Sequence, residues 1–277
     1  MSMRDRLKNC FKYLRVLAGR FVIIPRLDDL ERSLYDHIRF DTIIRKAALT
    51  VSSECMDGDY LEFGVYQGAS FIKAYHSLRE IYVWRFTDSE RIHSETHRQK
   101  VRQAWEQMRF FAFDSFEGLP APMEIDQQTQ NFTKGKYVCA EDVFRANLKA
   151  SDVDLGRVVT VPGFFDQTCN AETARRHNLR KACVVHIDCD YYDSTRVVLN
   201  FIRPLIQDGT VLIFDDWFCY KGNRMLGEQR AFYEWLSSMP DWTATEYQRE
   251  GHSRNSFIMN RNLPASSDQT RGMGTRA

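Results

Sequence analysis

Short apolar runs alternate along this chain with longer segments in which apolar residues recur at helical spacing. The strand-like runs lie at 60–63, 110–113, 157–161, 182–187 and 210–214, with two more near 243–247 and 256–259. The helix-period segments lie at 43–51, 71–78, 140–149, 197–205 and 232–239, and a polar, charged stretch covers 88–107. Strands that alternate with helices of this length are typical of a parallel sheet with helices on both faces. We therefore predict an α/β fold.

The composition of the 277-residue chain narrows the classes of protein further. With 43% hydrophobic residues, the chain can build the core of one large domain or two small ones. The 38 basic residues nearly balance the 37 acidic ones, so the overall charge offers no argument for nucleic-acid binding. Seven cysteines without a CxxC pair favour reduced thiols in a cytoplasmic protein over a disulfide scaffold or a zinc ribbon. No apolar run approaches the ~18 residues of a transmembrane helix.

The two ends of the chain differ from the segment between them. Residues 1–26 carry seven basic side chains against Asp5 alone, and their apolar residues recur at helical spacing. We expect a basic helical extension over 1–36, which could contact an anionic membrane surface or a partner such as a second copy of the chain. A packed helix is the simpler alternative. We expect one domain over 37–263 and a disordered tail over 264–277, which lacks periodicity.

Ligands of parallel sheets bind at the carboxyl ends of the strands, so the residues that follow each strand are the candidates for function. The first strand ends in Glu62, and Gly64 and Gly68 lead from it into a helix. Glycines allow a sharp turn and a close approach to a ligand, although a purely structural turn explains them equally well. The loop lacks the G-x-G-x-x-G of nicotinamide oxidoreductases. An acid before the glycine would suit a ligand that carries an ammonium or sulfonium group.

Acidic residues also follow three other strands. Asp114 ends the second strand, where a carboxylate can accept hydrogen bonds from both hydroxyls of a ribose or can simply form a turn. Four more acids follow the fourth and fifth strands, namely Asp188, Asp190, Asp215 and Asp216. Because adjacent parallel strands end side by side, these carboxylates should crowd together and require protons or a cation. Oxygen ligands favour Mg²⁺, Mn²⁺ or Ca²⁺ over zinc, and helix caps are the alternative explanation.

Three further polar residues near these strand ends have simpler explanations. His186 lies within the fourth strand, and we expect it to be a core histidine with satisfied hydrogen bonds. Cys189 and Cys219 lie near the acids, but no neighbouring base marks either as a nucleophile.

Four segments of the chain, within about residues 40–260, resemble the macrocin O-methyltransferase family. They read EFGVYQGAS at 62–70, FDSFEGLP at 113–120, HIDCDYYDST at 186–195 and FDDW at 214–217. This family comprises class I S-adenosylmethionine-dependent enzymes that methylate sugar hydroxyls in antibiotics such as macrolides. The resemblance implies a Rossmann-like class I methyltransferase fold, with a mostly parallel seven-stranded sheet and helices on both faces. The family has glycine where this chain has Cys189, which is tolerable if that backbone position is not left-handed.

The resemblance also implies roles for particular residues. The S-adenosylmethionine site would comprise Glu62, Gly64, Gly68, Ser70, Asp114, Ser115, Gly163 and Phe164. The magnesium site would comprise Asp188, Asp215 and Asp216, with another oxygen-preferring divalent cation as the alternative ion. Asp190 would be the general base, and the acceptor would be a hydroxyl of a sugar or glycosylated small molecule.

Two other functional classes remain open at this point. A metal-dependent hydrolase could use the aspartates alone, but it would leave Glu62, the glycine loop and Asp114 without roles. A non-catalytic protein could retain the fold and bind the cofactor, although the acids at all four metal and base positions argue against it.

Overall fold

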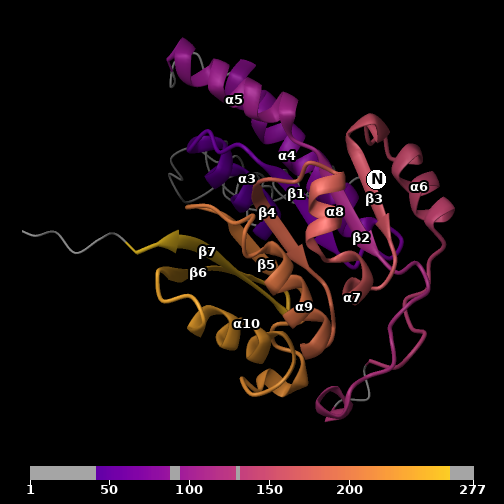
Figure 1. Ribbon diagram of the computed structural model, residues 1–277. Helices are drawn as coiled ribbons and strands as arrows, with labels where there is room; N and C mark the ends of the chain where they lie inside the picture. The colour runs from indigo at the N-terminus through magenta and orange to yellow at the C-terminus, as the bar shows by residue number, and fades with distance from the viewer. Residues whose placement is uncertain (1–41, 88–93, 129–131, 263–277) are drawn as a thin grey trace, which may run out of the picture. The chain divides into compact units, whose positions relative to one another are not determined.

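Parallel pairing dominates the sheet at the centre of the fold. The computed structural model describes residues 42–87, 94–128 and 132–262. These residues form a seven-stranded sheet in the order β3-β2-β1-β4-β5-β7-β6 (Figure 1). The strands are β1 (Asp59–Phe63), β2 (Phe110–Asp114), β3 (Val158–Pro162), β4 (Ala182–Ile187), β5 (Val211–Phe214), β6 (Trp242–Glu250) and β7 (Arg254–Arg261). Strands β1 to β5 run parallel, and β7 pairs antiparallel with both β5 and β6. The predicted, mostly parallel α/β sheet is confirmed.

Helices cover both faces of this sheet (Figure 1). They are α3 (Ile43–Ser53), α4 (Ala69–Thr87), α5 (Glu95–Gln107), α6 (Glu141–Ala150), α7 (Phe165–Thr168), α8 (Ala171–Arg176), α9 (Tyr192–Ile202) and α10 (Gly227–Ser237). The described residues also form three short 3₁₀ helices, namely η1 (Glu124–Gln128), η2 (Leu155–Arg157) and η3 (Tyr220–Gly222). Helix α4 packs against both α3 and α5, whereas α9 packs against α7 and α10.

The alternation of side chains along each strand divides the core between the two faces. Phe63, Ile187 and Phe214 point to the face covered by α9 and α10, where they join one large apolar cluster. The alternate residues Glu62 and His186 therefore point to the face covered by α3 and α4. Both residues are buried. Strands β1 and β4 are buried on both faces, and each carries a polar residue on the face covered by α3 and α4.

Helix α5 lies in the charged stretch for which the sequence predicted no element. Ser94 begins it by accepting a hydrogen bond from the amide of His97, and only Val101, Ala104 and Trp105 on it are buried. Three buried residues in 13 make too weak an apolar stripe for periodicity to detect. The last two strands also extend beyond their predicted limits.

Some predictions concern residues that the structure does not describe. The chain divides into units at 1–42 and 43–277, and the basic extension over 1–36 lies outside the described residues, as does the tail over 264–277. Among the helices that the structure does describe, none combines the length and the apolar character needed to cross a bilayer.

Candidate functional site

A cavity of about 500 Å³ opens at the carboxyl ends of β1, β2, β4 and β5. The predicted site residues that line it are Gly64, Asp114, Ser115, Phe164, Asp188, Asp190, Asp215 and Asp216. The cavity lining does not include Glu62, Gly68, Ser70 or Gly163. Sequence motifs more than a hundred residues apart therefore meet in one cavity, and the remaining predicted residues lie outside its lining.

Glu62 is completely buried beneath the loop that follows β1. Its Oε1 accepts a hydrogen bond of 2.6 Å from the Ser70 hydroxyl, and its Oε2 accepts one from the Tyr60 hydroxyl. Because Ser70 lies in the first turn of α4, these contacts tie the end of β1 to the start of that helix. In this structure Glu62 supports the loop and does not face the cavity.

The two glycines of this loop adopt left-handed backbone conformations. Gly64 has a φ of +86°, and a Cβ there would lie 2.1 Å from the carbonyl oxygen of Asp188. Gly68 has a φ of +88°, and a Cβ there would lie 3.0 Å from the ring of Phe144. The need for glycine therefore arises from contacts within the protein itself.

The Gly64→Ala substitution is expected to destabilise the fold. A left-handed alanine costs about 1–2 kcal/mol, and the contact with the Asp188 carbonyl adds to that cost because a backbone atom would have to move. Urea unfolding measures the loss, and Gly135→Ala is the matched control, since no atom lies within 4 Å of a Cβ at that left-handed position. A loss no larger than that of the control would contradict the close packing.

Asp114 links the loops that follow β1 and β2. Its Oδ2 accepts hydrogen bonds from the amides of Val65 and Tyr66, at 2.8 and 3.0 Å. Its Oδ1 accepts one from the amide of Phe116 at 2.8 Å. A carboxylate oxygen can accept more than one hydrogen bond, so Asp114 can form this turn and still bind a ligand in the cavity.

The neighbouring predicted residues shape the same corner. Ser115 donates from its hydroxyl to the carbonyl of Gly118. Gly163 donates from its amide to the carbonyl of Asp114, and Phe164 precedes the first residue of α7.

Three aspartates meet at the ends of β4 and β5. One carboxylate oxygen each from Asp188, Asp190 and Asp216 lies within 4.8 Å of the others. Burial raises the pKa of all three carboxyls, and the charges of neighbouring aspartates raise the pKa of each further. The Oδ2 atom of Asp216 is buried and accepts no hydrogen bond from the described residues. This set of crowded oxygens, with one unpaired acceptor, fits a divalent cation that prefers oxygen ligands.

The backbone at this cluster explains why a cysteine replaces the family glycine. Asp190 has a φ of +59°, whereas Cys189 is not among the described residues with a positive φ. Cys189 is buried. The left-handed residue is thus the aspartate, which tolerates that conformation better than most side chains.

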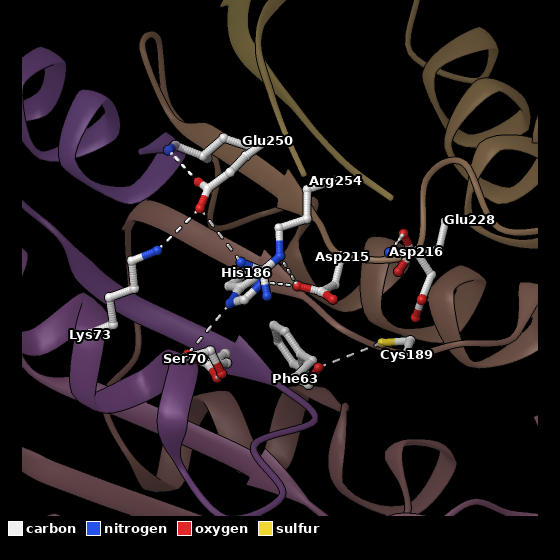
Figure 2. Close-up of polar contacts among 12 residues, drawn as sticks. Phe63, Ser70, Lys73, His186, Cys189, Asp215, Asp216, Glu228, Glu250 and Arg254 are labelled. Carbon is white, nitrogen blue, oxygen red and sulfur yellow. Dashed lines mark hydrogen bonds and ion pairs between the residues drawn. The ribbon is translucent and has the colours of Figure 1, made fainter. Parts of the chain in front are cut away.

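Asp215 lies apart from the three clustered oxygens, although it lines the same cavity. Its Oδ1 accepts hydrogen bonds from Nε of Arg254 at 2.5 Å and from Nε2 of His186 at 3.3 Å (Figure 2). Burial alone would raise the pKa of Asp215, but the hydrogen bond and charge of His186 and the charge of Arg254 lower it. The structure therefore groups the expected base, Asp190, with two expected metal ligands, Asp188 and Asp216. The third expected ligand, Asp215, is hydrogen-bonded to His186 and Arg254.

His186 is buried in β4 with both ring nitrogens near carboxylates, which confirms the expected satisfied histidine. Its Nδ1 lies 3.6 Å from Oε2 of Glu62, opposite the contact with Asp215. Burial opposes the charge of the ring, but the hydrogen bonds and charges of Asp215 and Glu62 prevail and raise the pKa of His186 to about 10.

Two charged residues at the site were not identified from the sequence. Arg254 begins β7, and no motif surrounds it. Glu228 is buried on α10, where its Oε2 accepts a hydrogen bond of 3.0 Å from the amide of Asp216. Burial raises the pKa of Glu228 well above its usual value. Helical periodicity could have indicated that Glu228 is buried, because it lies one turn before the buried Phe232 and two turns before the buried Trp235.

The fold and the site define an α/β protein of the Rossmann-like class, with its cavity at the carboxyl edge of the sheet. The family model described as macrocin-O-methyltransferase (TylF) matches residues 30–238. The chain therefore belongs to the macrocin-O-methyltransferase family, whose members are O-methyltransferases. This finding confirms the family expected from the sequence.

Individual proteins are similar to the chain over different lengths. The 8-demethyl-8-(2,3-dimethoxy-alpha-L-rhamnosyl)-tetracenomycin-C 4'-O-methyltransferase of Streptomyces olivaceus is 27% identical over 174 residues, which are 61% of this chain. The chain spans about 56% of the length of that curated relative. The solved O-methyltransferase NovP has a TM-score of 0.57 at 18% identity, covering 79% of this chain and 78% of NovP. The calicheamicin methyltransferase CalS11 has a TM-score of 0.52 at 19% identity, covering 93% of each chain. These two likenesses confirm the fold.

Proposed function

We propose that this protein transfers a methyl group from S-adenosylmethionine to a hydroxyl of a sugar or glycosylated small molecule, with the help of Mg²⁺ or another oxygen-preferring divalent cation. The observation that carries the proposal is the cluster of Asp188, Asp190 and Asp216 in the cavity that Asp114 and Gly64 also line. A cluster of carboxylates that could hold a cation, together with a carboxylate that could bind a ribose, is what transfer from this methyl donor to a hydroxyl acceptor would require.

The donor side of the cavity comprises the loop after β1 and the corner after β2. S-adenosylmethionine would supply a sulfonium-activated methyl group. Asp114, whose oxygens are already oriented by three backbone amides, would accept hydrogen bonds from ribose hydroxyls. Phe164 and Ser115 line the same cavity and would contact the nucleoside. Glu62, Gly68, Ser70 and Gly163 would act from outside the cavity lining, by holding the loops in shape.

The acceptor side comprises the aspartates. A sugar hydroxyl is a poor nucleophile at neutral pH, so its proton must be removed as the methyl group is transferred. Asp188, Asp215 and Asp216 would hold the divalent cation, which would supply positive charge that orients the acceptor and favours its deprotonation. Asp190 would accept the proton, and burial raises its pKa in the direction that makes a carboxylate a stronger base.

The nature of the acceptor is inferred from the family, from the curated relative and from the walls of the cavity. The relative is named for 4'-O-methylation of a rhamnosyl-tetracenomycin. In this chain Tyr66 and Tyr137 line the cavity as an edge-to-face pair, with ring centroids 5.9 Å apart, and both are exposed. Aromatic walls beside convergent carboxylates suit a sugar ring or a glycoside.

The proposed function is tested by binding and by transfer. Titration calorimetry should detect binding of S-adenosylmethionine to the protein and no binding of NAD. A tritiated-methyl transfer screen against glycoside and phenol libraries, with and without Mg²⁺, should then find an acceptor. Absence of S-adenosylmethionine binding at millimolar concentrations would contradict the proposal.

Asp114→Asn is expected to weaken S-adenosylmethionine binding by about 1–3 kcal/mol, because a charged acceptor is lost while one oxygen remains for the loop amides. Asparagine is preferred to alanine here, since Asp114 accepts three backbone hydrogen bonds. Calorimetry measures the affinity, and Asp142→Asn on the exposed start of α6 is the control. Unchanged affinity would make Asp114 only a turn residue.

A further inference from the structure

Charged side chains form a row across the sheet beneath α3 and α4. Glu62 on β1 pairs in register with His186 on β4, which pairs with Ile213 on β5, which pairs with Ser256 on β7. Asp215 lies two residues after Ile213 and Arg254 two residues before Ser256, so both continue the same face. Figure 2 shows His186 and Arg254 converging on Asp215.

Nitrogens of two side chains in this row, His186 and Arg254, contact the same oxygen atom. Nε2 of His186 lies 3.3 Å from Oδ1 of Asp215, and Nε of Arg254 lies 2.5 Å from that oxygen. Oδ2 of Asp215 receives no hydrogen bond from any described residue, and the Asp215 side chain lines the cavity. One oxygen of this carboxylate is therefore bound to the protein, and the other remains available to a ligand.

His186 and Arg254 are themselves held in position by other side chains. His186 is oriented from its other side by Glu62, which lies 3.6 Å from its Nδ1. The guanidinium of Arg254 lies 3.8 Å from Oε1 of Glu250. Glu250 in turn accepts hydrogen bonds from Nζ of Lys73 at 3.1 Å and from the amide of Ile43, at the start of α3, at 2.6 Å (Figure 2). The row thus connects the ligand-facing carboxylate to α3 and α4.

We propose that Arg254 and His186 are positioning residues that engage one oxygen of Asp215 and so leave its other oxygen, alone, for the divalent cation. This inference rests on the proposed function, because it assumes that Asp215 binds the cation. Mg²⁺ demands near-octahedral geometry, so a carboxylate that contributes one oriented oxygen is a better ligand than one that rotates freely. Residues that orient a metal ligand typically contribute 10–100-fold to metal affinity. Arg254 also offsets the negative charge of Asp215, which would otherwise add to the repulsion among Asp188, Asp190 and Asp216.

The test measures Mn²⁺ binding directly, by the electron paramagnetic resonance signal of the free ion, on the full chain without an acceptor. Arg254→Gln and His186→Leu should each weaken Mn²⁺ binding by about 10–100-fold. Arg254→Lys and His186→Gln, which each keep a donor for Oδ1, should recover part of that loss. S-adenosylmethionine affinity should be unchanged in both Arg254 variants, because Arg254 contacts Asp215 and Glu250 and neither Asp114 nor the β1 loop. Arg249→Gln is the matched control, since Arg249 on the adjacent strand is exposed and pairs with Glu246.

Each outcome has a distinct meaning. Wild-type Mn²⁺ affinity in folded Arg254→Gln and His186→Leu would overturn the positioning role. Equal losses in the conservative and the disruptive variants, with melting temperatures lowered in parallel, would also overturn it, because the residues would then act through stability alone. If the unaltered chain binds S-adenosylmethionine but no Mn²⁺, the metal part of the proposed function fails, and this result is separate from any effect of the substitutions.

Discussion

Asp190→Asn is expected to lower the rate of methyl transfer by about 10²–10⁴-fold, the usual contribution of a general base, while the chain remains folded. Asp190 is buried in the cavity wall. Its burial, together with the charge of Asp216, raises the pKa of Asp190. An amide of the same shape cannot accept the proton of the acceptor hydroxyl. Asparagine also tolerates the left-handed backbone at this position, where φ is 59°.

The measurement for Asp190→Asn is single-turnover transfer of a tritiated methyl group to the acceptor found by screening. Calorimetry on the same variant should return the wild-type affinity for S-adenosylmethionine. Asp152→Asn is the matched control, because Asp152 also has a left-handed backbone, with φ of 56°, and is exposed after α6. A variant with full activity would exclude Asp190 as the base.

Chelation of divalent cations is expected to abolish methyl transfer and to lower the melting temperature. Burial and the charges of neighbouring aspartates raise the pKa values of Asp188, Asp190 and Asp216, so three ionised carboxylates at this cluster are unfavourable when no cation is present. A cation that binds only the folded chain stabilises it by about 2.7 kcal/mol at a hundredfold excess over its Kd. The affinity for S-adenosylmethionine should survive chelation, because its proposed contacts follow β1, β2 and β3.

The chelation experiment combines a thermal unfolding scan with the tritium transfer assay, each in EDTA and again after Mg²⁺ is restored. Both the activity and the melting temperature should recover on restoration. Asp216→Asn should reduce the stabilising effect of Mg²⁺, because it removes the charge from a carboxyl whose Oδ2 accepts no hydrogen bond from the described residues. Full activity in excess EDTA would refute the metal role, and the aspartates would then be an acid–base cluster.

Local patterns predicted much of the fold because each depends on neighbours in the chain. The apolar run at 182–187 matches β4 from Ala182 to Ile187, since a strand buried on both faces needs continuous apolar residues. Helix α5 was missed because its buried stripe is sparse, and its stability depends on packing against α4. The acids that follow β2, β4 and β5 could be assigned to one cavity from the general geometry of parallel sheets alone.

Long-range contacts decided how those acids are used. Arg254 reaches Asp215 only because β7 returns antiparallel beside β5, which joins residues 39 positions apart. Glu62 lies outside the cavity lining because the pleat directs it toward α4, a choice that the motif around it does not reveal. The sequence by itself determined the order of the strands along the chain, the acids at their ends and the family. Tertiary structure alone decided that Asp114 is tied to the β1 loop and that one oxygen of Asp215 is bound by His186 and Arg254, because side-chain orientation depends on partners that only the folded sheet brings together.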